Sequence, residues 1–231
     1  VIKRDVLTLF NIRSPLLMEK LFLYLCMNST EIFNATTAAK ELENTSVITI
    51  DSYIGALEMS NLIYLAKPMD VGSKGAIKGK PKIFIADAAI RNAVLMIDDV
   101  LSDESELGAM VETTVYKHMA SFYQGSPASL GYFRKAKDNQ KEVDVVVELP
   151  RQKILCEVKY RSNSHISSTD AIVELCKDEK SKVTNAFLVT KRLDDFGITK
   201  HETKTPIFRI PAIAFLYILG KAEAEGQNGR L

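Results

Sequence analysis

Residues 142–160 read EVDVVVELPRQKILCEVKY and contain the features that decide the fold of this chain. Two apolar runs, each suited to a buried β-strand, flank a Pro-Arg turn. Three charged residues interrupt these runs: Asp144 in the first, and Glu157 and Lys159 in the second. Charged side chains are rarely buried without a partner or a metal ion, so these three residues need a physical reason.

The turn sets the expected register of the two strands. A hairpin centred on the Pro150–Arg151 bond pairs Asp144 with Glu157, because both residues are equally far from that bond. Opposed carboxylates repel each other, whereas a shared divalent cation would attract both, and their oxygens suit Mg²⁺ or Mn²⁺. The sequence therefore predicts a metal site at Asp144 and Glu157, unless a bulge shifts the register. The alternative is a structural ion pair in which Lys159 bridges one of these carboxylates.

The pattern D-(x)n-E-x-K across a strand pair, with an acidic helix upstream, resembles the PD-(D/E)XK nuclease superfamily. The resemblance implies that Asp144 and Glu157 bind the metal and that Lys159 positions or polarises an attacking water. It also implies a catalytic role for Glu112 in the upstream helix, for which plain exposure is the alternative. The sequence departs from the family pattern at Val143, which replaces a proline, and it lacks the glutamine that some branches carry after the lysine.

Composition limits the possible classes of protein. The chain has 231 residues and a formal net charge of +1, so it has room for one or two domains and no overall field that attracts nucleic acid. Its three cysteines are scattered, which favours a reducing cytoplasm. No apolar run approaches the ~20 residues needed to cross a membrane, and no signal peptide is visible. Because the chain begins at Val1, we expect it to be part of a longer protein.

Residues 1–97 predict a winged helix-turn-helix domain. Its expected helices and strands are residues 15–27, residues 33–42, a helix after the cap at 44–46, and strands at 61–65 and 82–85. The polar face of the third helix, with Thr49, Asp51, Ser52, Tyr53 and Glu58, lacks the basic residues that read DNA bases.

The loop between the two strands is rich in lysine. It is predicted to contact the phosphate backbone of nucleic acid through Lys74, Lys78, Lys80 and Lys82. The alternative is a solvated loop without this role. A phosphate-binding loop of the Walker A type is excluded, because Lys74 stands where that motif needs glycine and Pro81 follows Lys80.

Residues 98–219 predict an α/β domain with a mixed sheet, preceded by an acidic connector. The expected order is a helix over 105–123, strands over 130–136, 142–149 and 153–160, a helix over 168–179, strands over 183–189 and 206–210, and a helix over 212–219. The loop over 161–168 either contacts phosphates or is a plain connection. Residues 220–231 are expected to form a disordered tail.

The whole layout resembles the C-terminal part of a prokaryotic family of AAA-type ATPases, in which a winged helix and a nuclease-like domain of unknown function follow a P-loop domain. The phrases TIDSYIGALEMSNLIYLAKP and KPKIFIADAAIRNAV and the hairpin quoted above support this resemblance. It implies that ATP binds only to an N-terminal ATPase domain absent from this chain. The expected function is Mg²⁺-dependent hydrolysis of nucleic acid. The alternatives are an inactive DNA- or protein-docking module for that ATPase, and a purely structural interaction protein of the toxin–antitoxin kind.

Overall fold

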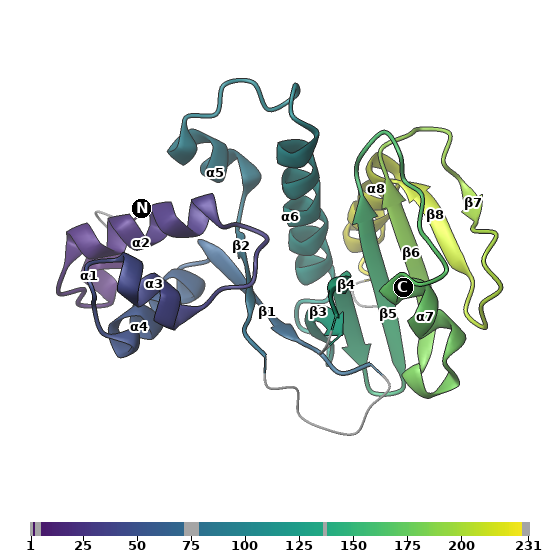
Figure 1. Cartoon of the computed structure of the whole chain (residues 1–231), viewed down its shortest axis with the longest axis horizontal. Coiled ribbons are helices and arrows are strands. Elements are labelled where there is room, and N and C mark those ends of the chain that lie inside the picture. The colour runs from purple at the N-terminus through teal and green to yellow at the C-terminus, as the bar shows by residue number, and fades with distance from the viewer. Residues whose placement is uncertain (1, 3–5, 72–78, 136–137, 228–231) are drawn as a thin grey trace. The chain divides into compact units, whose positions relative to one another are not determined.

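A computed structural model of the chain describes residues 2, 6–71, 79–135 and 138–227 (Figure 1). The chain forms two compact units, Val1–Ala66 with Lys80–Asp99, and Lys67–Gly79 with Val100–Leu231. N-terminal helices are followed by an eight-stranded mixed sheet with interspersed helices, as the sequence predicted for the fold class. In the part of the chain that is described, no helix is long and apolar enough to cross a membrane.

The N-terminal unit is built from short helices and one strand pair. Its helices are α1 (Leu7–Leu9), α2 (Pro15–Met27), α3 (Ala35–Glu41), α4 (Val47–Met59) and α5 (Ala88–Leu95), and its strands are β1 (Ile63–Pro68) and β2 (Lys82–Ile85). Ser14 caps α2 by accepting from the N–H of Leu17, and Ser46 caps α4 in the same way, as hydroxyl residues at these positions predict. The unit has its own apolar core, which includes Leu21 of α2 and Ile50 of α4.

Two features of this unit differ from the prediction. Tyr53 was expected on the polar face of α4, but it is buried, and its hydroxyl accepts the N–H of Ser14 at 3.0 Å. Its ring therefore joins the core while its oxygen satisfies a free N–H before α2. Helix α5 was not predicted; Asp87 caps it, and Arg91 turns back to donate to the backbone oxygen of Cys26 at 3.1 Å.

The C-terminal unit contains most of the sheet. Its strands are β3 (Ser129–Lys135), β4 (Asp138–Leu149), β5 (Gln152–Lys159), β6 (Val183–Thr190), β7 (Gly197–Ile198) and β8 (Ile207–Pro211). The strand order is β2-β1-β3-β4-β5-β6-β8-β7. Strands β3, β4 and β5 are antiparallel neighbours, whereas β5, β6 and β8 run parallel. Lys159, Thr190 and Pro211 are in register, so the carboxyl ends of the three parallel strands meet at one edge.

Helices cover both faces of this sheet. They are α6 (Glu104–Phe122), α7 (Ala171–Lys177) and α8 (Ala212–Ala224), with a 3₁₀ turn over Glu179–Ser181. Helix α7 shares a core with Leu188 of β6, whereas Phe215 of α8 packs against the adjacent Phe187. Because consecutive strand residues point to opposite faces, α7 and α8 lie on opposite sides. Helices α6 and α8 are joined by the Ser121 hydroxyl, which donates to Glu223 at 2.8 Å.

The beginning of the predicted lysine-rich loop is part of the C-terminal unit. Lys67 pairs with Gly131 of β3, and Met69 donates its N–H to the Tyr132 oxygen at 2.8 Å. Met69 and Val71 are buried in the core under α7. These residues were expected in the loop between the two strands; they are instead ordered against β3, because two apolar side chains gain burial there.

The C-terminal helix is longer than predicted. Helix α8 continues through residues 220–224, which were assigned to a disordered tail. Good helix-forming residues follow Gly220, and the contact of Glu223 with α6 holds this last turn in place. Residues 228–231 lie outside the described part of the chain.

Candidate active site

The hairpin between β4 and β5 forms in the predicted register. Pro150 and Arg151 are the two residues of the turn. The ladder runs from Leu149 opposite Gln152 to Val145 opposite Cys156, as a turn centred between the two residues requires. The described ladder ends one pair before Asp144 and Glu157. The two carboxylates therefore lie where the strands cease to pair.

A β-bulge accompanies this end of the ladder. Val146 of β4 lies opposite Gly131 of β3, whereas Val143 lies opposite Phe133. Two β4 residues, Asp144 and Val145, therefore face one β3 residue, so β4 has one extra residue there. Bulges re-aim side chains and end strand pairing. Here Asp144 turns toward β5, and its Oδ2 accepts the backbone N–H of Val158 at 2.7 Å. The carboxylate thus takes a position that a backbone carbonyl would hold in a continued ladder.

Glu157 is the most buried charged group of the site. It is 5% exposed, and its Oε1 forms an ion pair with Nζ of Lys159 two residues along the same strand face. Its other oxygen, Oε2, is buried and has no hydrogen-bond partner among the described residues. A buried carboxylate oxygen without a donor is costly and suggests a missing partner.

Burial and neighbouring charges shift the ionisation of this pair. Burial raises the pKa of Glu157 to about 8, and repulsion by Asp144 adds to the rise. Attraction to Lys159 opposes it, and the more distant Glu112 carboxylate adds a smaller repulsion. For Lys159, burial lowers the pKa, but the carboxylates of Glu157 and Asp144 outweigh burial and raise it. The lysine is therefore a cation at neutral pH, beside a Glu157 carboxyl whose charged form is disfavoured.

Glu112 lies on α6 and is half-buried. Its charge reaches Glu157, as the pKa of that residue indicates. Among the described residues, no group of three or more His, Cys, Asp or Glu side chains is arranged to hold a metal ion. The described geometry thus brings Asp144 and Glu157 together, without Glu112 as a third ligand.

The chemistry of this donor set fits a hard divalent cation. Asp144 and Glu157 supply carboxylate oxygens, and Oε2 of Glu157 has no donor in the described structure. Mg²⁺ is commonly held by one or two carboxylates and keeps several of its waters, so a third protein ligand is not required. A cation would also offset the repulsion that raises the pKa of Glu157.

Thr190 is a residue of this site that the sequence reasoning missed. It ends β6, is fully buried, and lies in register beside Lys159. Its hydroxyl oxygen is also buried and has no described partner. The signal in the sequence was the hydroxyl residue that ends the apolar run VTNAFLVT. If this strand paired in parallel with the strand ending at Lys159, its last residue would lie beside that lysine.

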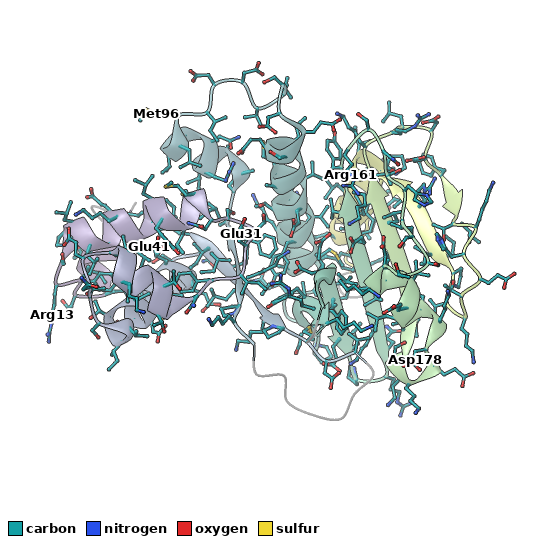
Figure 2. The ribbon with its side chains drawn as sticks, in the orientation of Figure 1. Arg13, Glu31, Glu41, Met96, Arg161 and Asp178 are labelled. Atoms are coloured by element: carbon teal, nitrogen blue, oxygen red, sulfur yellow. The ribbon has the colours of Figure 1, made fainter. Side chains whose placement is uncertain are left out.

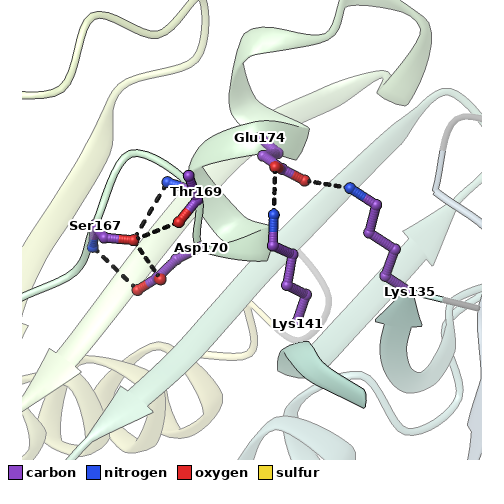
Figure 3. Close-up of polar contacts among 6 residues, drawn as sticks. All are labelled: Lys135, Lys141, Ser167, Thr169, Asp170 and Glu174. Atoms are coloured by element: carbon purple, nitrogen blue, oxygen red, sulfur yellow. Dashed lines mark hydrogen bonds and ion pairs between the residues drawn. The ribbon is translucent and has the colours of Figure 1, made fainter. Parts of the chain in front are cut away.

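The loop after β5 is held by hydrogen bonds near both of its ends. It starts at Arg161, which lies just past the carboxyl end of β5 (Figure 2). The hydroxyl and N–H of Ser162 donate to Glu104 at the start of α6. The hydroxyl of Ser167 donates to Asp170 at 2.8 Å, just before α7 (Figure 3). The loop is thus fixed at both ends.

Helix α7 is tied to the sheet by one carboxylate. Glu174 accepts from Lys141 of β4 at 2.7 Å and from Lys135 of β3 at 2.9 Å (Figure 3). These hydrogen bonds lower the pKa of Glu174. The contact links the helix to the two strands that form the bulge.

The four lysines predicted to contact nucleic acid differ in their exposure and in whether the structure describes them. Lys74 and Lys78 lie outside the described residues. Lys80 is exposed. Lys82 is 5% exposed in β2, with its ammonium 5.9 Å from the centre of the Phe84 ring. Burial of the Lys82 side chain in the N-terminal unit disfavours the predicted phosphate contact at this residue.

Comparison with known proteins identifies two domains whose function is unknown. Residues 1–101 match the domain of unknown function DUF8612, and residues 107–210 match the domain of unknown function DUF4143. A protein of Haemophilus influenzae (strain ATCC 51907 / DSM 11121 / KW20 / Rd), described as uncharacterized, is 22% identical over 187 residues. The aligned part covers 79% of this chain and 44% of that protein, so the chain spans less than half of its relative. The chain therefore matches two domains of unknown function and is distantly similar to an uncharacterized protein, and none of these matches assigns an activity.

Proposed function

We propose that the C-terminal unit is a nuclease-like domain that hydrolyses phosphodiester bonds of nucleic acid with Mg²⁺ or Mn²⁺. The main support is the pair of carboxylates at the end of the β4–β5 ladder, where Glu157 is buried and one of its oxygens has no partner among the described residues. Asp144 lies at a bulge, and Lys159 completes the D…E-x-K pattern on the same strand as Glu157. The order of helix and strands resembles the PD-(D/E)XK superfamily.

In this proposal each residue has a separate task. Asp144 and Glu157 would hold the cation, which supplies charge neutralisation at the phosphate and lowers the pKa of a bound water. Lys159 is protonated and is a quarter exposed, so its N–H groups can donate to the attacking water or to a phosphate oxygen. No side chain would form a covalent intermediate with the substrate.

The direct test is cleavage of labelled DNA and RNA oligonucleotides, single- and double-stranded, with Mg²⁺ or Mn²⁺. We expect Asp144→Asn and Glu157→Gln to reduce the cleavage rate at least about a hundredfold, the effect typical of removing one catalytic electrostatic group. Glu148→Gln is the matched control, since Glu148 lies on β4 and its side chain is 46% exposed. Cleavage that persists in Asp144→Asn would contradict the proposal.

The N-terminal unit has the elements of a winged helix-turn-helix, and we propose that it guides nucleic acid. Helices α2, α3 and α4 precede the β1–β2 pair, and Ile32 forms a further bridge with Lys82 of β2. On α4, Asp51 and Glu58 are exposed, which disfavours base reading by this helix. The exposed Lys80 favours contact with phosphates instead.

The second candidate function is an inactive docking module for an ATPase domain. The ion pair of Glu157 with Lys159 favours it, because a paired carboxylate is a weaker metal ligand. The ATPase domain itself is proposed only from the sequence resemblance. A docking module predicts DNA or protein binding that survives Asp144→Asn, together with no cleavage in the wild-type chain.

A further inference from the structure

A second polar site lies at the same edge of the sheet as the proposed metal site. A pocket of about 290 Å³ is lined by residues 162–165 of the loop after β5, by Arg192 and Asp195 after β6, and by Arg209 on β8. The three strands are parallel, and their carboxyl ends are in register. Ligands of open α/β sheets bind at this edge, so the position of the pocket favours a binding role.

The acidic group of the pocket is already engaged. Among the described residues that line it, Asp195 is the one carboxylate. Its Oδ2 accepts from the Ser164 hydroxyl at 2.9 Å, and its Oδ1 lies 3.6 Å from Nη1 of Arg209. Both Ser164 and the Asp195 side chain are largely buried. Asp195 therefore positions the two residues around it rather than attracting a cation.

Arg209 has donors that the described residues leave unfilled. Its Nε is buried and has no hydrogen-bond partner among them. Its ion pair with Asp195, at 3.6 Å, is longer than a hydrogen bond. A guanidinium has five N–H donors in a fixed plane, and a buried donor without an acceptor is costly. The pocket thus lacks an acceptor for Arg209.

A second guanidinium lies at the rim. Arg192 is exposed, and Asp194 beside it accepts from its Nη2 at 2.7 Å and from its Nε at 3.1 Å, so its Nη1 is the nitrogen that faces no carboxylate oxygen of Asp194. Each guanidinium has one carboxylate beside it, so the donor that the described contacts leave unfilled, Nε of Arg209, is what favours an anionic ligand. Arginine binds phosphate oxygens through two parallel hydrogen bonds. The volume is at the low end of the ~300–1,000 Å³ range of small-molecule sites, which suits a phosphate with part of its sugar.

We propose that this pocket binds a phosphate group of a nucleic-acid strand, with Arg209 as the principal ligand and Arg192 as the second. The identity of the strand rests on the proposed function, because the pocket would hold a substrate beside the carboxylates of the metal site. Phosphate binding in the pocket itself requires no metal.

The test is a calorimetric titration with a 5′-phosphorylated thymidine dinucleotide, with a chelator present. We expect binding that weakens at least about tenfold for a dinucleotide that lacks the 5′-phosphate and has an uncharged methylphosphonate linkage, and for Arg209→Gln, since a charge-assisted hydrogen bond is lost in each case. The matched control is Arg151→Gln, an exposed arginine of the β4–β5 turn, which should bind as the wild-type chain does. If Arg209→Gln does not fold, Arg192→Gln on the exposed loop replaces it, with a several-fold loss expected.

Three results would overturn the inference: equal binding of the uncharged methylphosphonate dinucleotide, no effect of Arg209→Gln or Arg192→Gln, or inorganic phosphate binding as tightly as the phosphorylated dinucleotide. The last would assign the pocket to free phosphate. A Mn²⁺ titration of the same samples separates this inference from the proposed function. If the chain binds Mn²⁺ but not the dinucleotide, only the proposed phosphate pocket is contradicted. If it binds the dinucleotide but not Mn²⁺, only the proposed metal site is contradicted.

Discussion

At the scale of single residues, the site depends on charged groups that are buried without a full set of hydrogen-bond or ion-pair partners among the described residues. Glu157 has one oxygen in an ion pair with Lys159 and one without a described partner. The sequence predicted Asp144, Glu157 and Lys159 as a group, because charges in apolar runs are conspicuous. Thr190 was not predictable in the same way, since its burial depends on pairing with a strand far away in the sequence.

The raised pKa of Glu157 predicts a pH-dependent stability. Between its ordinary value of 4.5 and about 8, the folded chain retains a proton that the unfolded chain has released. The contribution of Glu157 to the free energy of unfolding therefore falls as pH rises through this window. Glu157→Gln cannot ionise, so in chelator it should melt progressively higher than the wild type as pH rises to about 8.

Thermal melting at a series of pH values measures this difference. At low pH the wild type carries a protonated Glu157, so the variant and the wild type should then melt at similar temperatures. Glu148→Gln reports the general effect of removing a carboxylate from the same hairpin. A melting difference between Glu157→Gln and the wild type that is constant across the window would contradict the assigned pKa.

At the scale of elements, local signals predicted the hairpin and non-local packing decided the rest. The turn at Pro150 and Arg151 and the alternation around it set the register of β4 and β5 correctly. The bulge at Asp144 could not be predicted, because it arises from the pairing of β4 with β3. Burial of Met69 and Val71 was missed for the same reason, since the short segment has no periodicity of its own.

Gly131 is the residue that allows this segment to approach β3. A Cβ at this position would lie 2.0 Å from the backbone oxygen of Lys67 and 2.6 Å from Cγ of Met69. Gly131→Ala should therefore lower the free energy of unfolding by about 1–3 kcal/mol, the usual cost of overpacking. Gly108→Ala is the control, because a Cβ there meets nothing within 4 Å on α6 and alanine favours helix. Equal stability of the two variants in denaturant unfolding would show that the close approach is absent.

At the scale of the whole molecule, the chain combines two units with separate cores. The sequence predicted the mixed α/β class and the order of most elements, because helix caps and strand alternation are local signals. All residues of the proposed metal site and of the phosphate pocket belong to the C-terminal unit. We therefore expect the chemistry to reside there, with the N-terminal unit affecting how substrate reaches it.

Calorimetric titration of Mn²⁺ into the wild-type chain, Asp144→Asn and Glu148→Gln tests the central claim most directly. The proposed site predicts one Mn²⁺ per wild-type chain, unchanged binding in Glu148→Gln, and a loss of affinity of at least about tenfold in Asp144→Asn, as removal of one charged ligand implies. No binding to the wild-type chain, or equal binding to Asp144→Asn, would contradict a metal site at Asp144 and Glu157 and leave the docking module as the better account.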